Sequence, residues 1–211
     1  MKFNSIGRII LAVVLSISLI ATGCSVQWIS VALADLPFLT QMALNITALI
    51  ATLQSGEQLS PTEALGIQNI SIEASKDLIL LQGLYNAYKS NPSPATLQKI
   101  KTVIADINQN LPALLQAVHI SDAALSVRIT AAVSLIVTTV SSFESLIPPA
   151  PTSAKTARQN TVEQNVPQRK TVRENYAILN PKDLKRQWNQ QVCARSGNAI
   201  LDAALGERVL Q

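Results

Sequence analysis

The residue with the clearest chemical setting is Cys24, one of two cysteines in this 211-residue chain. An apolar run at residues 9–20 precedes it, and that run itself follows two cations, Lys2 and Arg8. Small residues at 21–23 separate the run from the cysteine. A positive start, a short apolar core and small residues follow one another in this order in secretory signal peptides. The order of these residues therefore predicts a secretory signal that ends at Cys24.

The sequence Ala21-Thr22-Gly23-Cys24 resembles the lipobox of a bacterial lipoprotein precursor. In that class the chain is cut between Gly23 and Cys24, the thiol carries a diacylglyceryl group, and the new amino terminus is acylated, typically with palmitate. The resemblance covers residues 1–24 alone. It implies a cell-envelope protein held to a membrane through Cys24. Ser25, where aspartate would favour the inner membrane, implies the outer membrane facing the periplasm if the host has two membranes.

Two alternatives for the N-terminal region stay open. The charge-free run continues from residue 9 to residue 34, and about 20 apolar residues can span a bilayer as an uncleaved helix. Polar or small residues interrupt that run at Gly23, Ser25 and Gln27, where a span would have to continue. Simple secretion without an anchor is the other alternative.

Metal and acid–base chemistry have few candidate residues. His119 is the only histidine, and one histidine with one further cysteine is too few for the usual zinc clusters. The carboxylates between residues 35 and 144 lack the Glu-x-x-His step of a di-iron bundle. The seven glycines form no phosphate-binding loop. The sequence therefore predicts a protein that is not an enzyme and holds no cofactor or metal.

Cys193 is left without an intramolecular partner if Cys24 is lipidated. An odd cysteine in an exported protein indicates a free thiol or an intermolecular bridge. A thiol packed against an amphipathic helix is the interpretation that we favour.

Basic residues gather beside a tryptophan near the C-terminus, on a short helix predicted to begin after Asn180-Pro181. Cations next to tryptophan are typical of helices that lie on anionic lipid. They also suit an acidic partner protein, whereas export argues against nucleic acid. Alternatively, this segment folds back onto the acidic body or is a solvated end. The candidate contact residues are Lys182, Lys185, Arg186 and Trp188.

Apolar residues recur at helical spacing in four segments of residues 25–147. The first segment covers residues 26–53 and contains Pro37, so we expect a kink or restart near Asp35, which would cap its second half. Ser60-Pro61 with Glu63 predicts a capping box at the start of the second helix.

The third predicted helix begins at Ser93-Pro94 and is interrupted at Pro112, with Asn110 as the cap of a restart. The fourth begins at Ser121-Asp122 and ends before Pro148. Connections this short force neighbouring helices to be antiparallel. We therefore expect an all-α fold, an antiparallel up-down-up-down four-helix bundle about 40 Å long.

The chain divides into four predicted regions: a signal peptide (1–23), the four-helix bundle (24–147), a flexible linker rich in proline and polar residues (148–175) and a basic amphipathic helical tail (176–211). Residues 25–150 contain 5 Lys/Arg and 8 Asp/Glu, whereas residues 151–211 contain 10 Lys/Arg and 5 Asp/Glu. The basic character of the mature chain is therefore confined to its last third.

The predicted helices carry little charge, and residues 129–143 carry none. This is typical of a well-buried bundle, of a groove for an apolar ligand, or of a membrane span. We expect a lipid-anchored envelope protein with a structural or interaction role. The alternative is a binding module that holds an apolar small molecule or a hydrophobic peptide. A continuous apolar pocket of about 300 Å³ or more would favour that alternative.

Overall fold

The computed structural model describes residues 27–147 and 180–211. Within these ranges the chain forms helices and no strand, which confirms the all-α prediction. The predicted signal peptide, the cleavage site at Gly23 and Cys24, and the predicted linker lie outside the described residues. The helices are α2 (Gln27–Ser55), α3 (Pro61–Ser90), α4 (Pro94–Ala117), α5 (Ala123–Leu146), α6 (Pro181–Gln191) and α7 (Ala199–Gly206).

The starts of α3 to α6 follow the predicted capping chemistry. At the start of α3, the Glu63 backbone N–H donates to Ser60 Oγ at 3.2 Å, and the Ser60 N–H donates to Glu63 Oε2 at 3.2 Å. This reciprocal pair is a complete capping box, and it satisfies two backbone donors that the helix itself leaves free. The side chains that cap α4 to α7 are Ser93, Asp122, Asn180 and Asn198, in that order.

The restarts predicted near Pro37 and Pro112 are wrong. Helix α2 continues through Pro37, and α4 continues through Pro112, so neither helix restarts. Pro37 is exposed, whereas Leu36 and Leu39 beside it are buried. Burial of neighbouring apolar side chains offsets the cost of about 3 kcal/mol for proline inside a helix. Asp35 is consequently an interior residue of α2 and not a cap.

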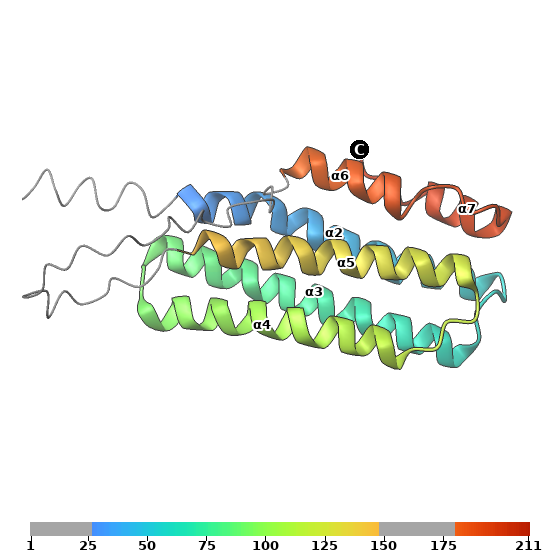
Figure 1. Ribbon diagram of the computed structural model, residues 1–211, viewed down its shortest axis with the longest axis horizontal. Coiled ribbons are helices and arrows are strands. Elements are labelled where there is room, and N and C mark those ends of the chain that lie inside the picture. Colours follow the sequence, from blue (N-terminus) through green and yellow to red (C-terminus); the bar gives the residue numbers. More distant parts are fainter. Residues whose placement is uncertain (1–26, 148–179) are drawn as a thin grey trace, which may run out of the picture.

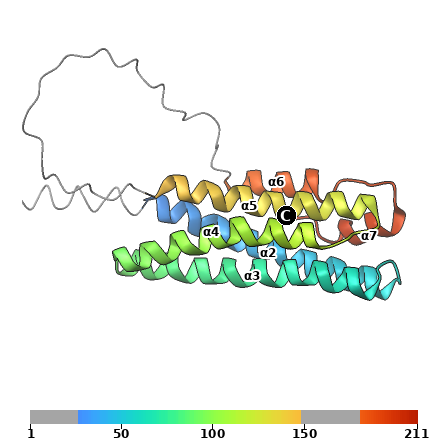
Figure 2. The same cartoon turned by 60° about the horizontal axis from the view of Figure 1, so that its bottom comes forward.

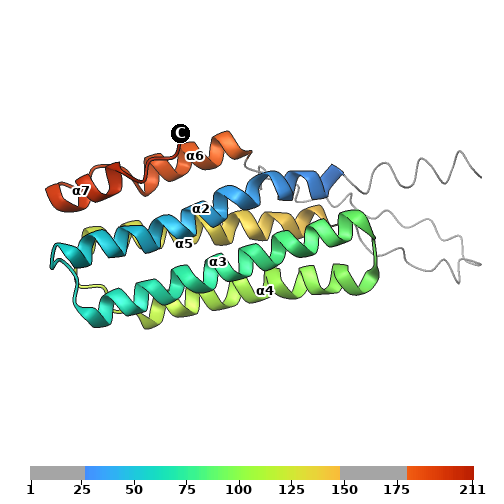
Figure 3. The same ribbon diagram turned by 180° about the vertical axis from the view of Figure 1, so that it is seen from behind.

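The four long helices lie side by side (Figure 1). Contacts join α2 to α3, α3 to α4, α4 to α5, and α5 back to α2. Helices α6 and α7 contact α2, and α6 also contacts α5. They lie on the side of α2 and α5 that faces away from α3 and α4 (Figures 1 and 3). The C-terminal segment, residues 180–211, therefore covers one face of the molecule and leaves the face formed by α3 and α4 uncovered by any described helix (Figure 2).

An aromatic cluster joins three of the long helices. The Trp28 and Tyr85 ring centroids are 5.6 Å apart, edge to face, and Tyr85 meets Phe143 in the same way at 6.2 Å. Tyr88 lies 6.0 Å from Trp28. Such pairs add about 0.5–1.5 kcal/mol each beyond the area that they bury. The cluster fixes α2, α3 and α5 against one another near the first turn of α2.

Two of the described helices, Trp28–Ser55 and Ala123–Leu146, are long and apolar enough to cross a membrane by length and composition. Only 50% and 44% of these windows are buried within the protein. Core helices of water-soluble proteins meet the same criterion, so the finding is weak evidence for a span.

Candidate functional site

The C-terminal segment docks on α2 and α5 through an apolar stripe. Residues on the inner side of α6 and α7 are each at most 2% exposed. Leu184, Trp188 and Val192 recur every four residues, which puts them on one side of a helix. The buried residues are Leu184, Trp188, Val192, Leu201, Ala204 and Leu205.

Trp188 lies inside the protein and not on its surface. Its side chain is 1% exposed, and its indole Nε1 donates to the Arg208 backbone carbonyl at 2.9 Å. In this arrangement the ring offers nothing to a membrane or a partner, so we remove Trp188 from the candidate contact residues. The alternative in which this segment folds back onto the body describes the observed structure.

The three predicted basic contact residues differ in their surroundings. Lys182 is exposed, and Arg186 is exposed and pairs with Asp183 at 2.6 Å. Lys185 Nζ lies 4.7 Å from the centre of the Phe38 ring of α2, a cation–π contact between the tail and the body. The basic side of α6 therefore remains at the surface, although one of its cations is used for docking.

The last residues of the chain run back along α6. The Asn189 amide donates to the Leu210 carbonyl at 2.9 Å, and its oxygen accepts from the Leu210 N–H at 2.9 Å. Lys185 Nζ donates to the Gln211 carbonyl. Because these bonds satisfy backbone groups that have no helical partner, residues 207–211 are ordered against α6.

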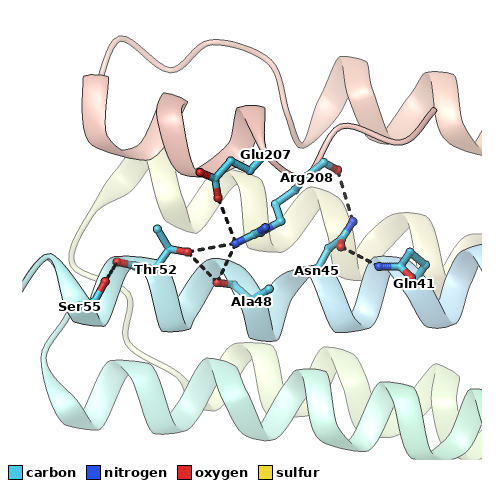
Figure 4. A network of polar contacts seen from close by, with 7 residues as sticks. All are labelled: Gln41, Asn45, Ala48, Thr52, Ser55, Glu207 and Arg208. Carbon is cyan, nitrogen blue, oxygen red and sulfur yellow. Dashed lines mark hydrogen bonds and ion pairs between the residues drawn. The ribbon is translucent and has the colours of Figure 1, made fainter.

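Arg208 joins the C-terminus to α2 (Figure 4). Its Nη2 donates to the Ala48 carbonyl at 3.3 Å and to Thr52 Oγ1 at 3.1 Å. Its own carbonyl accepts from Asn45 Nδ2 at 3.3 Å. Glu207 Oε2 lies 3.5 Å from the same guanidinium nitrogen. The guanidinium thus contacts a helix backbone, and such directional bonds fix the position of the segment along α2.

Arg128 of α5 makes a second polar connection. Its Nη1 donates to the Gln191 carbonyl at 2.8 Å and its Nη2 to the Arg195 carbonyl at 3.1 Å. These carbonyls lie at and just beyond the end of α6, where a cation is favourable. Asn198 Nδ2 donates to Asp122 Oδ2 at 3.4 Å, which also ties the start of α7 to the start of α5.

Cys193 is half-buried beside this connection and has no disulfide partner among the described residues. Burial raises the pKa of its thiol to about 11, although Trp188 and Arg128 act in the opposite direction. The thiol form is therefore the one present at neutral pH, and a thiol is a poor nucleophile. The side chain packs against the core, as the favoured interpretation expected.

Two buried carboxylates were not identified from the sequence. Asp35 is 0% exposed, and both of its oxygens lack a hydrogen-bond partner. Burial raises the pKa of this carboxyl from 3.8 to about 7. Its spacing from Ala32 and Leu39 puts Asp35 on the apolar side of α2. The sequence could have indicated this burial, but Asp35 was interpreted as a helix cap instead. Asp77 of α3, at 7% exposed, also has one oxygen without a partner.

Two hollows follow the seam between α3 and α4. One, of about 550 Å³, is lined by Ile72 and Glu73 of α3 and by Leu114 of α4. The other, of about 330 Å³, is lined by residues that include Leu80 and Val103. Both are open to solvent on the outer face and do not lie within the core.

His119 is exposed, and the described residues contain no group of three or more metal-type side chains. Comparison with protein-family models, with curated proteins and with solved structures gives no match for this chain.

Proposed function

We propose that this chain is a lipid-anchored protein of the bacterial cell envelope with a non-catalytic interaction role. The observation that carries the proposal is the sequence Ala21-Thr22-Gly23-Cys24 at the end of a charged and then apolar N-terminal segment. Lipidation at Cys24 with two or more chains would hold the protein stably, because a single acyl chain gives only marginal attachment. In a host with two membranes, Ser25 favours the outer membrane facing the periplasm.

The proposed body is an antiparallel up-down-up-down four-helix bundle. Supporting this, α2 to α5 are joined by connections of only three to five residues, at 56–60, 91–93 and 118–122. The contacts from α2 through α3 and α4 to α5, and back to α2, are those of a closed ring of neighbours. A rigid body of this kind would present its outer faces to other envelope components.

Intact mass of the chain recovered from a membrane fraction tests the anchor. The mass should match residues 24–211 plus acyl chains, and Cys24→Ala should lose both the cleavage and the added mass. Retention of residues 1–23 without added mass would overturn the proposal and would favour an uncleaved N-terminal helix.

A second candidate function is a binding module for a hydrophobic peptide. The two hollows between α3 and α4 favour it, since each exceeds the size of about 300 Å³ at which ligand pockets begin. Their position outside the core favours a peptide over a small apolar molecule held among the helices. Displacement of a fluorescent apolar dye by peptide, but not by small apolar molecules, would separate these two ligand classes.

A further inference from the structure

The α3–α4 groove, defined by the two hollows and the seam between them, presents apolar side chains to solvent. Ile72 is 50% exposed and Leu80 is 49% exposed. Leu114 and Val103 line the two hollows from the α4 side. Exposed apolar surface arranged along a groove is typical of sites that bind another helix.

The spacing of the hollows sets the spacing of any docked side chains. Ile72 and Leu80 are eight residues apart on α3, about 12 Å along the helix axis. Side chains seven residues apart on a docked helix are separated by about 10.5 Å and lie on one face. A helix that lies along the groove could therefore place one apolar side chain in each hollow.

Carboxylates occupy the stretch between the two hollows. Asp77 lies between Glu73 and Leu80 on α3, and Asp106 lies between Val103 and the first hollow on α4. Burial is the main cause that raises the pKa of Asp77. The negative charges of Glu73 and Asp106 raise it further, whereas the positive charge of Lys76 lowers it. One Asp77 oxygen has no hydrogen-bond partner. That oxygen is itself buried, so a cation brought between the hollows would meet the exposed Asp106 carboxylate directly and Asp77 only at longer range.

The opposite face of the molecule, formed by α2 and α5, shows what kind of helix docks on a pair of the long helices. On α2 and α5 the occupant is α6, an amphipathic helix with Leu184 and Trp188 buried and with Lys185 over the Phe38 ring. The α3–α4 groove also combines apolar surface with charge: Asp77 and Asp106 lie between the hollows, Lys99 lines the second hollow, and no described segment covers the groove.

We propose that the α3–α4 groove is the docking site for a helix of a partner protein that carries two apolar side chains seven residues apart and a lysine or arginine between them. The apolar side chains occupy the hollows at Ile72 and Leu80, and the cation meets Asp106, with Asp77 at longer range. This inference rests on the proposed interaction role but not on the lipid anchor. Failure of peptide binding and failure of the mass measurement are therefore distinguishable.

A synthetic peptide of about 15 residues, long enough to form a helix, provides the probe. It is built on alanine and glutamine, carries two leucines seven residues apart with one lysine midway, and bears a fluorescent label. A matched peptide has glutamate in place of the lysine. Binding is measured by fluorescence anisotropy with the full chain in nanodiscs of zwitterionic lipid, and empty nanodiscs give the background.

The lysine peptide should bind saturably, and the glutamate peptide should bind about tenfold or more weakly. Asp106→Lys should reverse this preference, whereas Glu144→Lys, an exposed charge reversal on α5, should leave it unchanged. Thr102→Trp, at an exposed position that lines the second hollow, should weaken both peptides. The proposal is overturned if neither peptide binds above empty nanodiscs, if both bind equally, or if Glu144→Lys has the effect of Asp106→Lys.

Discussion

The α2–α5 face and the α3–α4 face of this molecule are built from the same kind of helix, yet one is covered and the other is open. Residues 180–211 cover the first face and bury Leu184 and Trp188 there. The second face leaves Ile72 and Leu80 about half exposed. The difference shows that apolar surface alone does not decide which face the chain itself covers.

Polar groups distinguish the two faces. Two guanidinium groups join the covered face to the segment: Arg208 donates to the Ala48 carbonyl of α2, and Arg128 of α5 donates to the Gln191 carbonyl of α6. The open face presents Asp77 and Asp106 instead. Burial of a large side chain such as Trp188 contributes most of the docking free energy, about 1.5–3 kcal/mol per side chain. The directional bonds select where along the helices the segment lies.

The largest expected effect is that of Trp188→Ala. Removal of a buried aromatic side chain costs about 3–5 kcal/mol through lost burial and the cavity that remains. Because Trp188 also donates to the Arg208 carbonyl, we expect residues 180–211 to open while α2 to α5 remain folded. Native-state hydrogen exchange would show lost protection in α6 and α7. Ile72→Ala on the open face should cost less than about 1 kcal/mol, and equal costs would contradict the comparison.

The next effect concerns pH and Asp35. The folded state keeps the proton of this carboxyl up to about pH 7, whereas the unfolded chain loses it near 3.8, so the folded state binds more protons between these values. Stability therefore falls by a few kcal/mol as pH rises from about 4 to about 7. Asp77 contributes in the same direction. Urea unfolding across this range should show a much smaller fall for Asp35→Asn, and Glu144→Gln should keep the wild-type slope.

Local chemistry made the helices predictable from the sequence, and long-range packing made the site hard to predict. Ser60 with Glu63, Ser93 and Asp122 mark helix starts within a few residues of themselves, so the element order follows from the sequence. The predicted restart at Pro37 is wrong because the cost of proline inside α2 is offset by burial against distant helices. The docking role of Arg208 could not be predicted from local sequence patterns, because its partners Ala48 and Thr52 are more than 150 residues away along the chain.

Arg208→Gln should have an intermediate effect. Loss of its bonds to the Ala48 carbonyl and Thr52 removes charge-assisted interactions worth about 1.5–3 kcal/mol. Faster proteolysis within residues 180–211 would report this weakened docking. Arg186→Gln removes only an exposed pair with Asp183, worth about 0–1 kcal/mol, and should leave the cleavage rate near that of the wild type.

Gly83→Ala tests whether the exposed side of α3 at this residue is free in solution. A Cβ at this position in α3 meets nothing within 4 Å, and alanine favours a helix over glycine by about 1 kcal/mol. The urea midpoint should therefore rise slightly. At Gly66 of the same helix a Cβ would lie 2.7 Å from a Val118 methyl carbon, so Gly66→Ala should gain less or lose stability. Destabilisation by Gly83→Ala would mean that another segment or a second copy covers this side of α3 in solution.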